Sequence, residues 1–339
     1  MSVVFYHVYI IGEQVRYPFG GYFASFSEPG KFGVNLFFVL SGFIILFAHY
    51  KDIEQPTRIK TYAWRRLTKI YPMYWICSAL YVVVALAGIG QPDFTSDIRS
   101  ILSAVTLINF TEVPIVPLRV AWTLFYEMKF YIIFSAILIN RRFGIAVFSL
   151  WASYIAVSYF TGITDPLRLW TLWNVHFFLG GFIFLIRNKL PNAVGAPTLV
   201  LGIVGIIYCA IHVDFDLEPI EGRNNDLLLI IAASSAMIIL GSLKLEPMFQ
   251  KWAPSVLKYI GDASYSLYLV HSGIISAGYI ILRKFGLFGW VGEGVVYFGM
   301  AALATVGGCI THSFIEKPVL NWIRARSDAR KTGRVAAVS

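Results

Sequence analysis

Two polar side chains in apolar segments are the first residues of this sequence that could do chemistry. His7 lies within apolar residues 1–12, and Glu127 lies in the apolar run from Trp122 to Tyr131. If these segments are membrane helices, an ionisable group is costly there unless it has a partner or faces water, which predicts a functional role. A histidine can accept a proton near neutral pH and so act as a general base. A plain hydrogen bond between helices remains the alternative for both residues.

A cluster of cationic residues is the third feature that could take part in chemistry. Arg65, Arg66 and Lys69 precede an apolar segment that we expect to begin at Pro72, because proline suits the first turn of a helix. Arg66 and Lys69 are three residues apart and would share one face of a helix. Such a pair at the mouth of a membrane helix suits the phosphates of a cytoplasmic ligand. The alternative is an anchor to anionic lipid headgroups.

Composition shows what must position these residues. The 339 residues are 57% hydrophobic and 14% charged, and the mean hydropathy is +0.67. That leaves too little polar surface for a soluble domain of this size. The sequence therefore predicts an all-α polytopic membrane protein, with the lipid bilayer as its surroundings.

Apolar stretches of about 20 residues, the length that spans a bilayer, predict about ten transmembrane helices. The first stretch is about half that length, so we expect a truncated first helix or a start upstream. The expected spans are 1–12, 33–50, 72–90, 121–140, 143–160, 169–187, 195–212, 227–243, 260–282 and 289–314. Residues 102–110 are expected as a short re-entrant piece.

The distribution of lysine and arginine predicts the topology. If the first segment runs outward, the inner side receives most of these residues, and the outer side receives the acidic residues of 214–226. Both termini are then cytoplasmic, in a multi-pass membrane protein. The net charge of +9 mostly reflects this bias, and we expect no nucleic-acid partner.

The cysteines and histidines do not predict a metal site. Cys77, Cys209 and Cys309 each lie in an apolar run without metal or redox spacing, and are expected as buried small hydrophobes. The six histidines show no close pairing with acidic residues. We therefore expect no metal cofactor.

Six motifs, in order along the chain, resemble those of the membrane-bound acyltransferase 3 family. Gly33–Phe43 resembles its Gly-Val-Asp-x-Phe-Phe-Val-x-Ser-Gly-Phe signature, and Arg65–Pro72 its Arg-x-x-Arg-Ile-x-Pro motif. The other four matches are His7, the run Trp122–Glu127, the segment Ser264–His271 and the close Glu316–Pro318. The resemblance covers residues 1–318 as one transmembrane domain and leaves 319–339 as a basic cytoplasmic tail.

The resemblance implies transfer of an acyl group, usually acetyl, from cytoplasmic acyl-CoA to a sugar hydroxyl. The acceptor would be a bacterial exopolysaccharide or its lipid-linked precursor, with the polysaccharide-synthesis machinery as a further partner. The resemblance also implies a location in the bacterial inner membrane. We assign His7 as the base and Glu127 as the group that orients or charges the cavity. The phosphates of the donor would be held by Arg65, Arg66 and Lys69. Candidate substrate-binding residues are Asn35, Trp122, Tyr126, Tyr131 and, more weakly, His271.

The sequence departs from the family pattern at three places. Asn35 stands where an aspartate is usual, so it can fix a histidine tautomer but cannot stabilise an imidazolium by charge. Lys69 replaces the second arginine and would bind phosphate as a point charge. The family arginine some ten residues before the histidine would precede Met1.

Two other function classes remain open. A transporter or flippase of a lipid-linked or small anionic substrate would also bury a glutamate and a histidine, although it would tend to show repeated halves. A non-enzymatic sensor or assembly partner would tolerate the loss of His7. The acetyl content of the surface polysaccharide distinguishes these classes.

Overall fold

The protein is described from a computed structural model covering residues 1–88, 97–163, 171–212, 225–252 and 254–336. Every regular element in these residues is helical, which confirms the all-α prediction. The α-helices are α1 (Ser2–Gln14), α2 (Gly21–Ser27), α3 (Gly33–His49), α4 (Ile59–Leu86), α5 (Ile98–Thr106), α6 (Trp122–Ile139), α7 (Arg141–Thr161), α8 (Trp173–Ile186), α9 (Gly195–His212), α10 (Asn225–Trp252), α11 (Ser255–Asp262), α12 (Ser264–Lys284), α13 (Glu293–Thr311) and α14 (Lys317–Ala336). Short 3₁₀ turns are η1 (Glu28–Phe32), η2 (Tyr50–Asp52), η3 (Pro56–Arg58), η4 (Arg119–Ala121) and η5 (Asn192–Val194), and a π-helical turn, η6, covers His312–Glu316.

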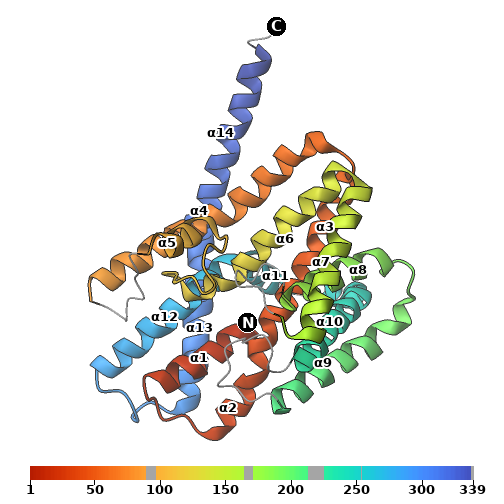
Figure 1. The fold of residues 1–339 in the computed structure, drawn as a ribbon. Helices are drawn as coiled ribbons and strands as arrows, with labels where there is room; N and C mark the ends of the chain where they lie inside the picture. Colours follow the sequence, from red (N-terminus) through yellow and green to blue (C-terminus); the bar gives the residue numbers. More distant parts are fainter. Residues whose placement is uncertain (89–96, 164–170, 213–224, 253, 337–339) are drawn as a thin grey trace.

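Within the described residues, eight helical stretches are long and apolar enough to cross a membrane. The helix α8 is apolar but shorter, and α1 has 13 residues, in keeping with the short first segment of the sequence. Figure 1 shows these helices gathered into one bundle, from which α14 projects toward the C-terminus. The segment expected as a separate tail, 319–339, therefore continues as a helix to Ala336.

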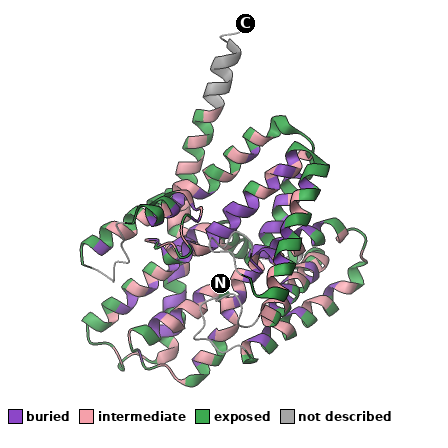
Figure 2. Cartoon of the chain, in the orientation of Figure 1, coloured by how far each residue is buried: buried purple, intermediate pink, exposed green. Residues whose placement is uncertain are grey.

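The helix α6 lies at the centre of the bundle. Of its most apolar membrane-length window, 67% is buried inside the protein, against 17% for the neighbouring α7. Buried residues run along α6 on most of its surface (Figure 2). The polar side chains of Thr123, Glu127 and Lys129 on α6 are buried and therefore face other helices and not lipid.

Glycines bring α3 and α8 into backbone contact. A Cβ atom built on Gly42 would lie 2.2 Å from the carbonyl oxygen of Phe177, and one built on Gly180 would lie 2.0 Å from that of Val39. No side chain fits at either position. Small residues at helix crossings are a common way for membrane helices to pack closely.

The expected position of Pro72 at the start of a helix is wrong. The helix α4 begins at Ile59, so Pro72 lies in its interior and the basic stretch before it is helical. An interior proline removes one backbone hydrogen bond, and neighbouring helices can satisfy the freed groups of a membrane helix. Two residues before the proline, the Tyr265 hydroxyl on α12 donates to the Ile70 carbonyl at 2.8 Å and ties α4 to α12.

Three aromatic side chains of α4 hold the end of α5. Tyr71 and Tyr74 donate their hydroxyls to the carbonyls of Thr106 and Ala104, and the Trp75 indole donates to the next carbonyl, of residue 105. The last carbonyls of a helix have no partner within that helix, so these bonds satisfy them. The segment expected as a re-entrant piece is thus a short helix tied to α4.

Candidate active site

Two histidines from opposite ends of the chain meet inside the bundle. His7 on α1 and His271 on α12 have ring centroids 4.8 Å apart, in an edge-to-face arrangement. His7 is half-buried, whereas His271 is fully buried. The first apolar segment therefore places His7 against another helix, as a functional residue in a membrane requires.

The backbone fixes the tautomer of both rings. Nδ1 of His7 is 2.8 Å from the Val3 carbonyl, and Nδ1 of His271 is 2.7 Å from the Tyr268 carbonyl. A carbonyl can only accept, so each Nδ1 carries the proton and each Nε2 offers a lone pair. The Nε2 atom of His271 is buried without a hydrogen-bond partner in the described part of the chain.

One face of α6 leads away from this pair. Thr123, Glu127 and Tyr131 are spaced by four residues and so follow one another along the helix, with about 12 Å between the first and the last. The Thr123 hydroxyl lies 2.8 Å from that of Tyr268, whose ring is next to that of His271. The face of α6 therefore begins beside the histidines.

Glu127 is the middle member of that face and is 6% exposed. Its Oε1 accepts hydrogen bonds from the Ser41 hydroxyl at 3.1 Å and from the Tyr131 hydroxyl. Arg66 and Lys69 are the cations that act on its carboxyl electrostatically. Glu127 is thus bound on both sides and stands between the histidines and the basic part of α4.

The three predicted donor-binding cations of α4 differ in position. Arg66 is half-buried, and its guanidinium carbon lies 5.5 Å from the centre of the Tyr131 ring. Arg65 and Lys69 are exposed. Arg66 therefore reaches the interior, whereas the other two remain at the surface.

These contacts, together with the four-residue spacing of Thr123 and Glu127 on α6, align a row of polar side chains through the bundle, which we call the polar seam. It consists of His7, His271, Tyr268, Thr123, Glu127, Tyr131 and Arg66. Four of the predicted site residues, which are far apart in sequence, are brought into it: His7, Glu127, Arg66 and His271. Tyr131, expected to line the acceptor path, also belongs to it.

The predicted substrate-binding residues Asn35, Trp122 and Tyr126 lie together at a second place, around Trp173. The amide nitrogen of Asn35 lies 2.8 Å from Nε2 of His176, whose ring stacks on that of Trp173. The rings of Trp122 and Tyr126 also contact Trp173. Asn35, Trp122 and Tyr126 therefore share an aromatic cluster of α3, α6 and α8, and the histidine that Asn35 contacts is His176.

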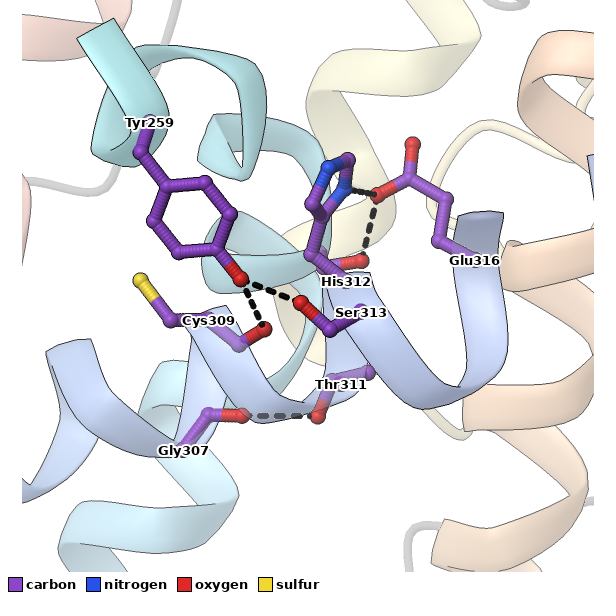
Figure 3. A network of polar contacts seen from close by, with 8 residues as sticks. Tyr259, Gly307, Cys309, Thr311, His312, Ser313 and Glu316 are labelled. Atoms are coloured by element: carbon purple, nitrogen blue, oxygen red, sulfur yellow. Dashed lines mark hydrogen bonds and ion pairs between the residues drawn. The ribbon is translucent and has the colours of Figure 1, made fainter. Parts of the chain in front are cut away.

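A further buried carboxylate occupies the π-helical turn η6. Glu316 accepts hydrogen bonds from the Ser266 hydroxyl at 2.6 Å and from Nδ1 of His312 at 2.7 Å (Figure 3). The neighbouring Ser313 hydroxyl contacts that of Tyr259 on α11 (Figure 3). Single π-turns often occur at functional sites, and this one ties α13 to the helix that carries His271.

His176 was not singled out from the sequence, and Tyr268 and Glu316 were named only as parts of two motifs, without a role. All three are polar groups in apolar surroundings, so the reasoning applied to His7 could have assigned them to a site.

The expectation that no histidine pairs closely with an acidic residue is wrong, because His49 contacts Asp52 and His312 contacts Glu316 three and four residues further along the chain. Among the described residues, no group of three or more His, Cys, Asp or Glu side chains is arranged to hold a metal ion.

Comparison with known proteins identifies the family of the chain. An acyltransferase domain model, that of acyltransferase family 3, matches residues 1–313. The chain belongs to this family. It is thus a membrane acyltransferase, and the family match spans both the seam and the aromatic cluster.

Relatives of this acyltransferase include proteins of polysaccharide metabolism. It is 28% identical over 319 residues to the exopolysaccharide production protein ExoZ of Rhizobium meliloti, covering 91% of this chain and 95% of that protein. It is 23% identical to the O-acetyltransferase OatA of Staphylococcus aureus, covering 87% of this chain and 53% of OatA. It is 24% identical to the peptidoglycan O-acetyltransferase OatA of Listeria monocytogenes, covering 74% of this chain and 46% of that protein. The chain thus spans about half the length of the OatA proteins, and no solved structure matches it.

Proposed function

We propose that this acyltransferase moves an acyl group, with acetyl favoured, from cytoplasmic acyl-CoA to a hydroxyl of a bacterial exopolysaccharide or its lipid-linked precursor. The names of the relatives support a carbohydrate acceptor and an acetyl group. The observation that carries the proposal is the polar seam, because it links a cation suited to an anionic donor with an imidazole suited to act as base.

The reaction uses His7 as the general base. Its Nε2 lone pair takes the proton of the acceptor hydroxyl, and the oxygen attacks the thioester carbonyl to form a tetrahedral intermediate. The carbon–sulfur bond then breaks, and the imidazolium returns its proton to the leaving thiolate. The Nδ1 bond to the Val3 carbonyl holds the ring in the required tautomer throughout.

Other residues hold and orient the two substrates. Arg66, assisted by the exposed Arg65 and Lys69, binds the phosphates of the donor at the inner mouth. Glu127 balances these cations inside the bundle. The aromatic cluster around Trp173 provides ring faces for the acceptor, and the buried His271 keeps His7 in place.

The proposal is tested by the ester content of the polysaccharide. His7→Ala should abolish the acyl esters, measured by mass spectrometry of the purified polymer, while polymer export continues. The matched control is His212→Ala, because His212 is exposed on α9 and its Nδ1 bonds only to its own helix at Tyr208. Unchanged ester content with His7→Ala removes His7 from the mechanism, and lost export favours a transporter.

A further inference from the structure

The end of α3 carries a histidine that touches the donor-binding arginine. His49 is the last residue of α3 and is 1% exposed. Its Nδ1 lies 2.8 Å from the carboxylate of Asp52, and its Nε2 lies 2.9 Å from a terminal nitrogen of Arg66. The imidazole thus bridges a carboxylate in η2 and a guanidinium in α4.

The chemistry of the three groups fixes the direction of both bonds. A guanidinium can only donate, so Nε2 of His49 must accept from Arg66 and carry no proton. A carboxylate accepts, so Nδ1 carries the proton and donates to Asp52. The other tautomer would set an N–H of His49 against an N–H of Arg66. Asp52 therefore selects the tautomer that can hold Arg66.

The arginine held in this way faces the interior. Its guanidinium lies over the ring of Tyr131, and its Nε is buried without a hydrogen-bond partner in the described residues. The preceding residue, Arg65, is exposed and makes no contact with His49 among the hydrogen bonds of the described residues. A free arginine side chain loses rotamer entropy when it binds a ligand. Restraint by His49 removes part of that loss before the ligand arrives.

We propose that His49 and Asp52 are positioning residues that hold Arg66 ready for the anionic part of the donor. The proposal rests on the proposed function, which makes acyl-CoA the donor. His49 does not touch the reacting atoms and acts through Arg66. Asp52 acts one step further away, through the tautomer of His49.

The test is the affinity of the purified full chain in nanodiscs for acetyl-CoA, measured by isothermal titration calorimetry. His49→Ala should raise the dissociation constant about tenfold, because a hydrogen bond to a charged group is lost. His49→Gln should restore much of the affinity, because its amide can donate to Asp52 and accept from Arg66. His212→Ala is the control and should leave the affinity unchanged.

A double-mutant comparison separates positioning from a general structural effect. Arg66→Ala and Arg66→Ala with His49→Ala should bind the donor equally weakly, because His49 acts only through Arg66. Additive losses in the double variant would overturn the proposal, as would normal affinity in His49→Ala.

A second variant covers the case in which His49→Ala does not fold. Asp52→Ala removes the carboxylate that accepts the Nδ1 proton, so the tautomer of His49 that holds Arg66 is no longer selected. It should weaken binding in a protein with an unchanged size-exclusion profile, and normal affinity would overturn the proposal. Absence of acetyl-CoA binding by the unaltered protein would instead overturn the proposed function, and with it the role of this contact in donor binding.

Discussion

Three buried or half-buried histidines are held by the same kind of hydrogen bond, from the ring to a backbone carbonyl. Nδ1 of His7, His176 and His271 each donates to a carbonyl three or four residues earlier in its own helix. Every helix supplies such a carbonyl, so an imidazole in a membrane helix can satisfy one nitrogen without help from a neighbour. The other nitrogen is then available to a neighbouring residue or a substrate. In His176 it meets Asn35, and in His271 it is free of protein partners in the described residues.

Substitutions of Glu127 can separate the effect of its charge from the effect of its hydrogen bonds. Glu127→Gln keeps an oxygen that accepts from Ser41 and Tyr131, so it should destabilise the protein less than Glu127→Ala does, while acyl transfer falls. Glu127→Ala leaves both hydroxyls unpaired and should destabilise the protein by about 1–3 kcal/mol. Thermal unfolding in detergent measures both effects. Ile132→Ala, on the exposed side of α6, is the control, and equal melting of the Gln and Ala variants would contradict this reasoning.

For single residues, the sequence predicts which ones have a functional role, but it does not predict which residues they contact. A histidine or glutamate in an apolar run stands out from composition alone, as His7 and Glu127 do. Their partners depend on helices distant in the chain. Nothing near Asn35 in the sequence indicates His176, and nothing near His7 indicates His271. Only the order of the six motifs, through the family resemblance, indicated that these segments meet.

Among the elements, the crossing of α3 and α8 is the most sensitive to substitution. Gly180→Ala places a methyl group against the Val39 carbonyl and forces the helices apart. We expect a loss of about 1–3 kcal/mol, as for other overpacked interiors. The same displacement should break the bond between Asn35 and His176.

The matched control for this prediction is Gly273→Ala on α12, where nothing lies within 4 Å of the added Cβ. Alanine is favoured over glycine in a helix by about 1 kcal/mol, so this variant should melt at the same or a higher temperature. Differential scanning fluorimetry of both variants in detergent is the measurement. A Gly180→Ala protein as stable as the control would show that the helices can separate without loss.

Helix boundaries were harder to predict than helix existence. The sequence placed a helix start at Pro72 because proline is favoured there, and the preceding basic residues resembled a loop. In the structure α4 begins thirteen residues earlier, at Ile59. Contacts from distant helices, such as the bond from Tyr265 to the Ile70 carbonyl near the proline, hold this part of α4 in place. Arg66 and Lys69 nevertheless belong to one helix, as their spacing predicted.

For the whole molecule, the distribution of cations predicts that both termini face the cytoplasm. Single cysteines at two exposed positions test this: Thr57 before α4 should be inside, and Ile163 after α7 should be outside. A membrane-impermeant thiol reagent added to intact cells should label Ile163→Cys only. After permeabilisation it should label both. Labelling of Thr57→Cys in intact cells would reverse the topology and place Arg66 on the wrong side for a cytoplasmic donor.

The four-residue spacing along α6 has a consequence for how this protein can change. Each residue turns a helix by about 100°, so one amino acid gained or lost between Thr123 and Glu127 would swing the two ends of this face out of line. Tyr131 would then point away from Arg66 while Thr123 stayed beside Tyr268. Insertions and deletions between Thr123 and Tyr131 should therefore not be tolerated. Homologous enzymes that keep the reaction should differ in length at other places in the chain.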